Sequence, residues 1–518
     1  MSGNRLAPKE KLYYNKLQIL RNRGAEMITI KNETVKIQKN FWNNCLFHPT
    51  DAVEDAWGRR ILDQMAEDGA VQSIRIYSML EDIVYLDGND NLCYDFRVSD
   101  LRLDYLLEKG YNILLAYAGM PECIASDPTV HNIDAKGFRR YKGKVFNTSP
   151  PADYALYEEV CYAYTKHNVE RYGIDVVSTW HCHCHNEPDL HFFMNYLPDD
   201  DIQPKIREYC KLYAAFQRGV RRVSERILIG GPACAFSLEF IEAFLNYVRE
   251  NNLKLDYIAL HNYGTCTAEV NAGTRPIKVQ NNIDRQRNLI NVIEKCGFGE
   301  TERVVDEWGA STDGYYNMED CPAYIFRETE VYSAYYTRLI HDMIRLDPKL
   351  TKMMICLSGQ HEMVTDFSGF RNFFTLNFIR KPIYNAHILA SKLGQQLLSA
   401  EHDTKDLFVV PTKREDGSYA VLLSYASEYF TEDLPQITER LQFTESIDQK
   451  TVTVWCIDKT TTNPYRLYEK LGISTTPTRE EIRLLREEGT LKPVVVQSGS
   501  EALTLTLTPN CTYLITAE

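Results

Sequence analysis

Residues 180–190 of the chain read WHCHCHNEPDL, an alternating strand-like run that leads into turn residues. Residues 304–311 read VVDEWGAS and close a second strand-like run in the same way. Short apolar runs of this kind recur along the chain, and a helical pattern separates each from the next. They give eight predicted strands: Phe41–Leu46, Gln72–Met79, Tyr111–Ala118, Val176–His185, Arg226–Gly230, Leu255–His261, Arg303–Glu307 and Lys352–Leu357.

The stretches between these strands carry the spacing of amphipathic helices. In YCKLYAAFQRGVRRV, for example, Leu212, Phe216 and Val220 share one face. Neighbouring parallel strands need crossover helices, so eight strand–helix units indicate a parallel sheet. Eight units that close on themselves give a (β/α)8 TIM barrel, an α/β fold that we expect over residues 41–394.

The pattern changes to β structure after the barrel. NPYRLYEKLG and TREEIRLLREEG are predicted helices within it, so we expect residues 395–518 to form an accessory β-sandwich domain with a helical insertion. The segment MITIKNETVKIQKN, within residues 1–40, has strands flanking a turn and is expected to join this sandwich. The predicted strands of the C-terminal part are Asp406–Val410, Tyr419–Ser424, Thr451–Asp458 and Leu503–Thr516.

The composition narrows the class of ligand. The 518 residues are 44% hydrophobic and 25% charged, as in a folded globular protein, and carry a net charge of −13. An acidic protein repels nucleic acid and anionic membranes, whereas a neutral sugar is compatible with this charge. The N-terminal residues contain no apolar stretch typical of a secretion signal or membrane span. Fourteen cysteines without framework spacing indicate reduced thiols and a cytoplasmic location.

Two glutamates follow the fourth and seventh predicted strands. The active site of a TIM barrel lies at the C-terminal ends of its strands, where Glu187 and Glu307 stand. Glycosidic bond cleavage needs two carboxyl groups, and a separation of about 5–5.5 Å makes the second one a nucleophile, with retention of configuration. We therefore expect Glu187, with a raised pKa, to be the general acid/base and Glu307, ionised, to be the nucleophile.

Each motif also has a purely structural interpretation. In NEP the asparagine can cap a helix and the proline suits its first turn. Acidic residues after strands, as in DEWG, commonly cap helices as well. The presence of both motifs, at the ends of the fourth and seventh of eight strands, favours the catalytic interpretation.

Dispersed segments of the chain also carry a family resemblance. They are FWNNCLFHP, IRIYSMLEDIVYLD, NEPD, GGPAC, ALHNYG, VVDEWGAS, FIRKPIYNAHILASKLG and NPYRLYEKLG. In this order they resemble glycoside hydrolase family 39, whose best-known members are β-xylosidases and α-L-iduronidases. The resemblance places the acid/base role on Glu187, with Asn186 beside it, and the nucleophile role on Glu307. It also implicates His261 and Tyr263 near the sugar.

The chain departs from the family pattern around the expected sugar pocket. His185 and His183 stand where the family usually has an aromatic residue before NEP and an acid two residues earlier. Tyr77 stands where the second strand commonly ends in a sugar-binding histidine. The eighth-strand segment MMICLSGQHEM lacks the usual tryptophan. We expect Tyr77 and His185 to contact the substrate, and these departures leave open whether the sugar is xylose.

A run of histidines precedes the expected acid. His181, His183, His185 and Glu187 alternate, so they share one face of the predicted strand. Imidazole binds zinc well, so a metal-dependent hydrolase is one interpretation. Successive residues on one face of a strand lie about 7 Å apart, however, which favours a hydrogen-bonded polar core beneath the acid. We expect neither a metal nor a cofactor.

Two further residues are candidates for substrate binding. Trp308 directly follows the expected nucleophile and either lines the pocket or packs in the core. Arg75 lies two residues before Tyr77 and faces the same way, so it either orients Glu307 or is a hydrogen-bonded core arginine.

These observations predict a retaining glycoside hydrolase that removes terminal sugars from oligosaccharides and resembles β-xylosidases. One alternative keeps the mechanism but changes the sugar to an arabinopyranoside, a galactoside or a glucoside. Another is a non-catalytic carbohydrate-binding protein on the same scaffold. The expected partner is an oligosaccharide or glycoside, and assembly into a homo-oligomer is left open.

Overall fold

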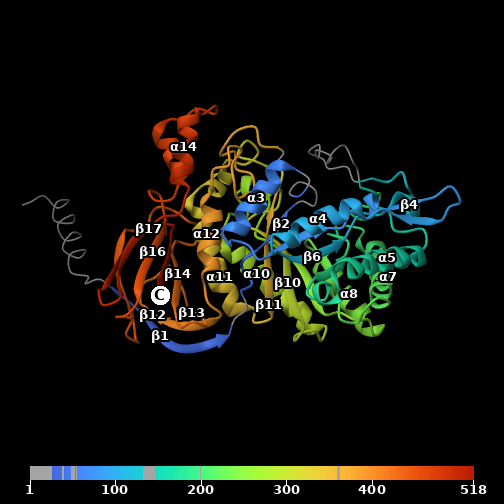
Figure 1. The fold of residues 1–518 in the computed structure, drawn as a ribbon, viewed down its shortest axis with the longest axis horizontal. Helices are drawn as coiled ribbons and strands as arrows, with labels where there is room; N and C mark the ends of the chain where they lie inside the picture. Colours follow the sequence, from blue (N-terminus) through green and yellow to red (C-terminus); the bar gives the residue numbers. More distant parts are fainter. Residues whose placement is uncertain are drawn as a thin grey trace, which may run out of the picture.

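The structure is a computed structural model that describes residues 26–37, 40–47, 53, 55–131, 146–198, 200–358 and 362–518. Two β structures dominate it (Figure 1), a closed barrel on the right of the view and a large twisted sheet on the left. Residues 1–25 of the predicted N-terminal segment lie outside the described part. Within the described residues, no helix is long and apolar enough to cross a bilayer.

Eight parallel strands close the barrel in the order β10-β11-β2-β3-β6-β7-β8-β9, which confirms the predicted TIM barrel. The eight predicted strands all overlap observed ones. One start is wrong: Val176 lies in the short helix α6 (Ile174–Val177), and the fourth strand begins only at His181. The bounds are β2 Asn44–Phe47, β3 Ser73–Tyr77, β6 Asn112–Tyr117, β7 His181–Cys184, β8 Leu228–Cys234, β9 Tyr257–Tyr263, β10 Glu302–Gly309 and β11 Leu350–Leu357.

Helices surround the barrel and cover its strands. On α7 (Ile202–Arg221) the predicted apolar face is buried, with Leu212, Phe216 and Val220 all fully covered. A Cβ at Gly219 would lie 2.5 Å from a carbonyl oxygen of α5 (Tyr154–Tyr172), so glycine lets these two helices approach closely. The others are α3 Ala56–Glu67, α4 Arg97–Glu108, α8 Leu238–Glu250, α9 Thr267–Asn271, α10 Val279–Lys295, α11 Glu330–Leu346 and α12 Pro382–Ser391.

Short elements decorate the barrel. Strands β4 (Val84–Leu86) and β5 (Leu92–Tyr94) pair as a small antiparallel hairpin at the end of the molecule far from the large sheet (Figure 1). Among the described residues, 3-10 turns lie at η1 Leu80–Asp82, η2 Glu122–Ile124 and η4 Pro322–Glu328.

The large sheet has nine strands in the order β17-β16-β19-β14-β13-β12-β1-β15-β18. Leu441 and Leu505, near one edge, share a core with Val454, near the other edge, so the sheet folds back on itself as a sandwich. The bounds are β1 Glu26–Ile37, β12 Gln396–Glu401, β13 Leu407–Lys413, β14 Tyr419–Tyr425, β15 Ile437–Phe443, β16 Thr451–Ile457, β17 Pro493–Ser498, β18 Leu503–Leu507 and β19 Cys511–Ala517.

Two predictions for this sheet are wrong in detail. The N-terminal segment forms the single strand β1, which pairs with β12 and β15, instead of two strands about a turn, and the irregularity in it is a register shift at Lys31 and Thr34. The predicted strand Leu503–Thr516 is two strands, because Pro509 and Asn510 form a turn between β18 and β19.

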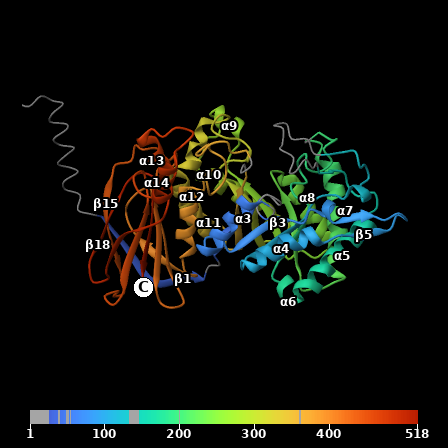
Figure 2. The same cartoon turned by 45° about the horizontal axis from the view of Figure 1, so that its top comes forward.

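The helical insertion ties the sheet to the barrel. Helices α13 (Pro464–Leu471) and α14 (Arg479–Glu488) lie between β16 and β17, and α14 projects from the sheet in Figure 1. Arg466 and Asn463, at the start of α13, bind the buried Glu330 of the barrel helix α11 at 2.9 and 2.7 Å. Figure 2, a tilted view, shows α13 and α14 close to the sheet beside α12.

Candidate active site

The chain leaves β7 through a strained turn that carries Glu187. His185 and Glu187 have φ values of 62° and 47°, in the left-handed region that non-glycine residues rarely adopt. The Glu187 backbone N–H donates to Ala233 at 3.0 Å, and Asp189 accepts three backbone N–H groups at the start of α8. These bonds fix the turn. The NEP motif does not begin a helix, since the described residues that follow it form turns.

A bulge in β10 brings two carboxylates into the barrel. Val305 pairs with Leu260 and Glu307 with His261, so Asp306 is an extra residue relative to β9. Because of this bulge, Asp306 and Glu307 both face inward, and Arg75 on β3 contacts Asp306 at 2.9 Å and Glu307 at 2.6 Å.

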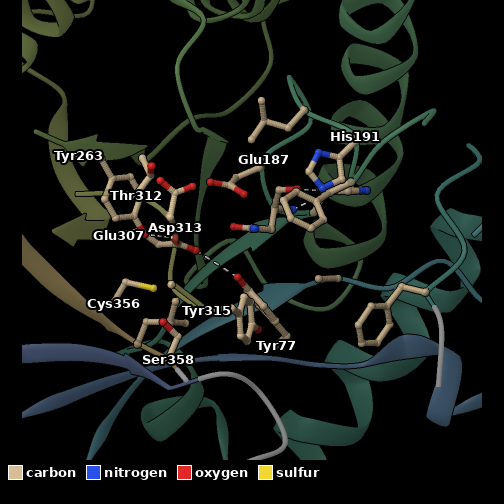
Figure 3. Close-up of a pocket in the computed structure, with 18 of the residues that line it drawn as sticks. Tyr77, Glu187, His191, Tyr263, Glu307, Thr312, Asp313, Tyr315, Cys356 and Ser358 are labelled. Carbon is tan, nitrogen blue, oxygen red and sulfur yellow. Dashed lines mark hydrogen bonds between the residues drawn. The ribbon is translucent and has the colours of Figure 1, made fainter. Parts of the chain in front are cut away.

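The two predicted glutamates meet over the mouth of the barrel (Figure 3). A carboxylate oxygen of Glu187, one of Glu307 and a ring nitrogen of His261 all lie within 4.8 Å of one another. Tyr263 donates to Glu307 at 2.6 Å and Tyr77 donates to it at 3.2 Å. This separation leaves room for an anomeric carbon between the two carboxyl groups.

The surroundings of the two glutamates move their pKa values apart. Burial raises the pKa of Glu187 above its ordinary value, against a hydrogen bond from His261. Burial acts on Glu307 as well, but the charges of His261 and Arg75 and the hydrogen bond from Tyr263 outweigh it and lower its pKa. One carboxyl group therefore keeps its proton where the other is ionised, as an acid and a nucleophile require.

Beneath the glutamates lies a fully buried charge cluster. Asp306 contacts Arg75 and lies 3.7 Å from His261, and it is ionised because these cations outweigh its burial and lower its pKa to about 2. Burial lowers the pKa of His261, but the carboxylates of Glu307 and Asp306 and the bond to Glu187 raise it to about 10. His261 is therefore an imidazolium, and its Nδ1–H donates to Glu187 at 2.9 Å.

A cavity of about 390 Å³ opens above these groups. Of the predicted site residues, Tyr77, His185, Asn186, Glu187, Tyr263 and Glu307 line it. Arg75 and His261 do not line it, because they are fully buried below the glutamates and contact them instead of the substrate space. Arg75 also donates to Asn186 at 2.7 Å, which orients that side chain.

Several lining residues have no counterpart in the prediction. They include Thr312, Asp313, Tyr315, Cys356, Ser358 and Arg371. Most of the labelled ones surround Glu307 in Figure 3. Cys356 lies near the end of β11 itself. The others come from the loops after β10 and β11, where the sequence has no periodic signal, although their position after barrel strands is itself an indication.

Comparison with known proteins agrees with a glycoside hydrolase site. A family model for glycosyl hydrolases family 39 matches residues 27–500. The chain belongs to glycosyl hydrolases family 39. The predicted resemblance is confirmed, and this member of family 39 is a glycoside hydrolase.

Curated relatives match either nearly the whole chain or a part of it. A beta-xylosidase of Caldicellulosiruptor saccharolyticus is 25% identical over 492 residues, which are 90% of this chain and 91% of that protein. An alpha-L-iduronidase of Canis lupus familiaris is 24% identical over 248 residues, 43% of this chain and 34% of the relative. In fold, a monomeric beta-xylosidase from Caulobacter crescentus CB15 superposes with a TM-score of 0.78 at 19% identity, covering 95% of this chain and 99% of that one.

The histidine run of this family 39 chain is dispersed over separate partners. His181 binds Glu302 at 3.0 Å, and His183 lies 3.4 Å from Asp306. His185 accepts the Asn186 backbone N–H at 2.7 Å. Burial, helped by the charge of Arg75, lowers the pKa of His183 to about 3, and burial lowers that of His185 to about 4. Both rings are neutral members of a polar core.

Among the described residues, the group close enough to share a metal ion is Glu187, His261 and Glu307. A metal needs neutral imidazole and ionised carboxylates. The pKa of His261 is raised, so its ring is protonated, and the pKa of Glu187 is raised, so its carboxyl group keeps its proton to a higher pH than an ordinary glutamate. This group therefore suits acid–base chemistry better than metal binding.

Trp308 does not line the pocket, contrary to the prediction. Side chains alternate along a strand, so with Glu307 facing inward Trp308 faces outward. Its indole is fully buried and stacks on Tyr336 of α11, with ring centroids 5.6 Å apart. The residue therefore belongs to the packing between the barrel and its helical layer.

This correction gives a stability test. Changing Trp308→Ala should lower the free energy of unfolding by about 3–5 kcal/mol, because it leaves a cavity beneath α11. Trp308→Phe should cost less, since the indole N–H has no hydrogen-bond partner among the described residues. Urea unfolding measures both. A Trp308→Phe enzyme whose KM rises about tenfold at unchanged stability would contradict this placement.

Proposed function

We propose that this glycoside hydrolase works by double displacement with net retention of configuration. Glu187 is the general acid/base and Glu307 is the nucleophile. The observation that carries the proposal is the approach of their carboxylate oxygens within 4.8 Å. This is close to the separation of about 5–5.5 Å in retaining enzymes and well below that of about 6.5–9.5 Å in inverting ones. The opposite directions of their pKa shifts support the same assignment.

The steps follow from these positions. A Glu307 oxygen attacks the anomeric carbon while Glu187 gives its proton to the glycosidic oxygen, which leaves with the bond electrons as an alcohol. A glycosyl ester on Glu307 results. Glu187, now a carboxylate, takes a proton from water, whose oxygen attacks the same carbon and releases Glu307. Tyr263, Tyr77 and Arg75 hold the nucleophile in position throughout.

For the substrate, we infer a terminal sugar with β-xylosides as the first choice. The relative that matches over 90% of the chain is named a beta-xylosidase, and the cavity of about 390 Å³ suits one or two sugar rings. Arabinopyranosides, galactosides and glucosides are the alternatives on the same mechanism. The presence of both glutamates counts against a non-catalytic carbohydrate-binding protein. The cytoplasmic location and a homo-oligomeric state stay predictions.

The test is a panel of aryl glycosides followed by product analysis. Release of nitrophenol across the panel identifies the sugar, and proton NMR of the first product identifies its anomer. We expect the product to have the anomeric configuration of the substrate. Inverted product would remove Glu307 as nucleophile, and activity unchanged by Glu187→Gln and Glu307→Gln would remove both assignments.

A second candidate, an acidic sugar, is favoured by Arg371. This guanidinium lines the pocket and is 7% exposed, and no described carboxylate accepts a hydrogen bond from it. Its hydrogen-bond partners among the described residues are the Ser358 hydroxyl, the Cys356 thiol and the Ser311 carbonyl, each at 3.2 Å. A buried cation is costly unless an anion joins it. A sugar carboxylate would fill this need, and relatives named alpha-L-iduronidase match part of the chain.

Arg371→Gln separates the two candidates. If the sugar is a uronic acid, kcat/KM on its aryl glycoside should fall by about 10- to 100-fold, since a hydrogen bond to a charged group contributes about 1.5–3 kcal/mol. The same variant should change kcat/KM on an aryl xyloside by less than about threefold. Equal losses on both substrates would mean that Arg371 acts only through the shape of the pocket.

The pKa directions give an expected pH dependence. Activity needs Glu307 ionised and Glu187 protonated, so kcat/KM should be bell-shaped. The acidic limb should report Glu307 and fall below the ordinary glutamate value of 4.5, because its pKa is lowered. The basic limb should report Glu187 and lie above 4.5, because its pKa is raised. A pH series of kcat/KM checks this, and a profile with no basic limb would contradict the role of Glu187.

A further inference from the structure

The cavity is divided into two halves by the order of the barrel strands. The loops after β9, β10 and β11 follow neighbouring strands and form one half, and those after β6, β7 and β8 form the other. The first half, around Glu307, carries Tyr263, Thr312, Asp313, Ser358 and Arg371. In Figure 3 the labelled members of this half stand around Glu307, with His191 on the far side of Glu187.

The second half carries large apolar side chains. Leu190 and Phe192 follow β7, Phe236 follows β8, and all three line the cavity. Phe236 is 48% exposed. These side chains offer a surface that gains free energy when an apolar group removes it from water.

Part of the polar lining of this half is engaged with other protein groups. Asn147 donates to the Asp127 carbonyl at 2.8 Å and accepts from Ser149. Thr148 donates to Asn195 at 2.8 Å. His191 differs, since its buried Nε2 has no hydrogen-bond partner among the described residues. A second sugar ring, with several hydroxyls to satisfy, would have to compete with the existing bonds of Asn147 and Thr148.

We propose that this half binds the leaving group and that it selects an aromatic or apolar aglycone over a second sugar. The inference rests on the proposed function, because the proton donor marks the side where the leaving group departs. Glu187 comes from the β7 loop, as do Leu190 and Phe192, so the atom that it protonates lies toward these side chains. An aryl or benzyl group attached there would cover Phe236 and Phe192.

The experiment compares leaving groups of similar basicity. Benzyl β-xyloside, xylobiose and methyl β-xyloside all release an alcohol, so differences among variants report binding and not leaving-group reactivity. If the panel selects another sugar, the same three derivatives of it are used. We measure kcat/KM for wild type, Phe236→Ala, Phe192→Ala and the double variant. Methyl β-xyloside, which has no aglycone to cover the rings, is the control for folding and catalysis.

The double variant should lower kcat/KM on benzyl β-xyloside about tenfold, and change it on methyl β-xyloside and xylobiose by less than about threefold. A loss on xylobiose as large as on benzyl β-xyloside would overturn the proposal in favour of a sugar subsite. A benzyl loss no larger than the methyl loss would also overturn it. Wild type inactive on all three, whatever the sugar, would instead overturn the proposed function.

A second measurement uses transfer of the sugar from the glycosyl ester to an added alcohol. In a retaining enzyme an added alcohol can replace water as the acceptor from the glycosyl ester, and it binds where the leaving group departed. Wild type should transfer the sugar to benzyl alcohol in preference to xylose, and Phe236→Ala should lose this preference. A preference for xylose in wild type would overturn the proposal.

Discussion

Replacing Glu307 by alanine should lower kcat on 4-nitrophenyl β-xyloside by about 10⁴- to 10⁶-fold, the cost of removing a nucleophile. Asp306 cannot take its place, because it is fully buried below and held by Arg75 and His261. The variant should still fold, since the cavity above Glu307 admits water to the truncated position.

Added azide tests whether the group removed in Glu307→Ala is the nucleophile. With Glu307→Ala, azide can enter the vacated side and displace the leaving group once, so a β-xyloside should give the α-xylosyl azide. Glu302→Gln is the matched control, since Glu302 lies on the same strand at the opposite end and binds His181. It should keep kcat within about twofold. A Glu307→Ala enzyme with more than a tenth of wild-type kcat would refute the nucleophile.

Replacing Glu187 by alanine should have an effect that depends on the leaving group. On benzyl β-xyloside, whose alkoxide needs a proton, kcat/KM should fall by about 10²- to 10⁴-fold, the usual contribution of a general acid. On 2,4-dinitrophenyl β-xyloside it should fall far less, because that leaving group departs as a stable anion.

Two signatures distinguish the acid/base from a residue that only shapes the site. On the dinitrophenyl substrate, the Glu187→Ala variant should lose the basic limb of its pH profile, because the group that titrates there is gone. Azide should give the β-xylosyl azide, since it attacks the glycosyl ester on Glu307 and configuration is retained over the two steps. Equal losses on both substrates would count against proton donation.

The meeting of Glu187 and Glu307 was predictable because it depends on topology. Once eight strand–helix units are recognised, residues directly after strands four and seven must meet at the same end of the barrel. The family resemblance placed Tyr77 and Tyr263 near the sugar, and both line the cavity. Their hydrogen bonds to Glu307 needed the structure, because a bond depends on angles that spacing does not contain.

What the sequence did not reveal depends on local irregularity. Alternation alone places Asp306 outside when Glu307 is inside, and only the bulge in β10 turns both inward. The same alternation, applied strictly, places Trp308 outside, so its assignment to the pocket gave too much weight to its position beside Glu307. Arg371 lies well beyond the end of β11 in an irregular loop, where no periodicity indicates which side chain returns to the pocket.

In the C-terminal sheet, long apolar runs were recognised and shorter or more polar strands were missed. Tyr419–Ser424 is nearly the observed β14, whose residues are all buried. Strands β12, β15 and β17 were not predicted. Of these, β17 is an edge strand that begins with a proline and is mostly exposed, so burial leaves little pattern in its sequence.

The position of β1 between β12 and β15 has a consequence for the order of assembly in the cell. Every barrel strand lies between Asn44 and Leu357 and can associate while the chain is still being synthesised. Strand β1, however, the first of the described strands, finds its first neighbour only when β12 has emerged, up to Glu401, and its second only when β15 has emerged, up to Phe443. Before β12 emerges, β1 has neither of these neighbours. A chain truncated before β12 would leave β1 without them permanently and expose a template for aggregation.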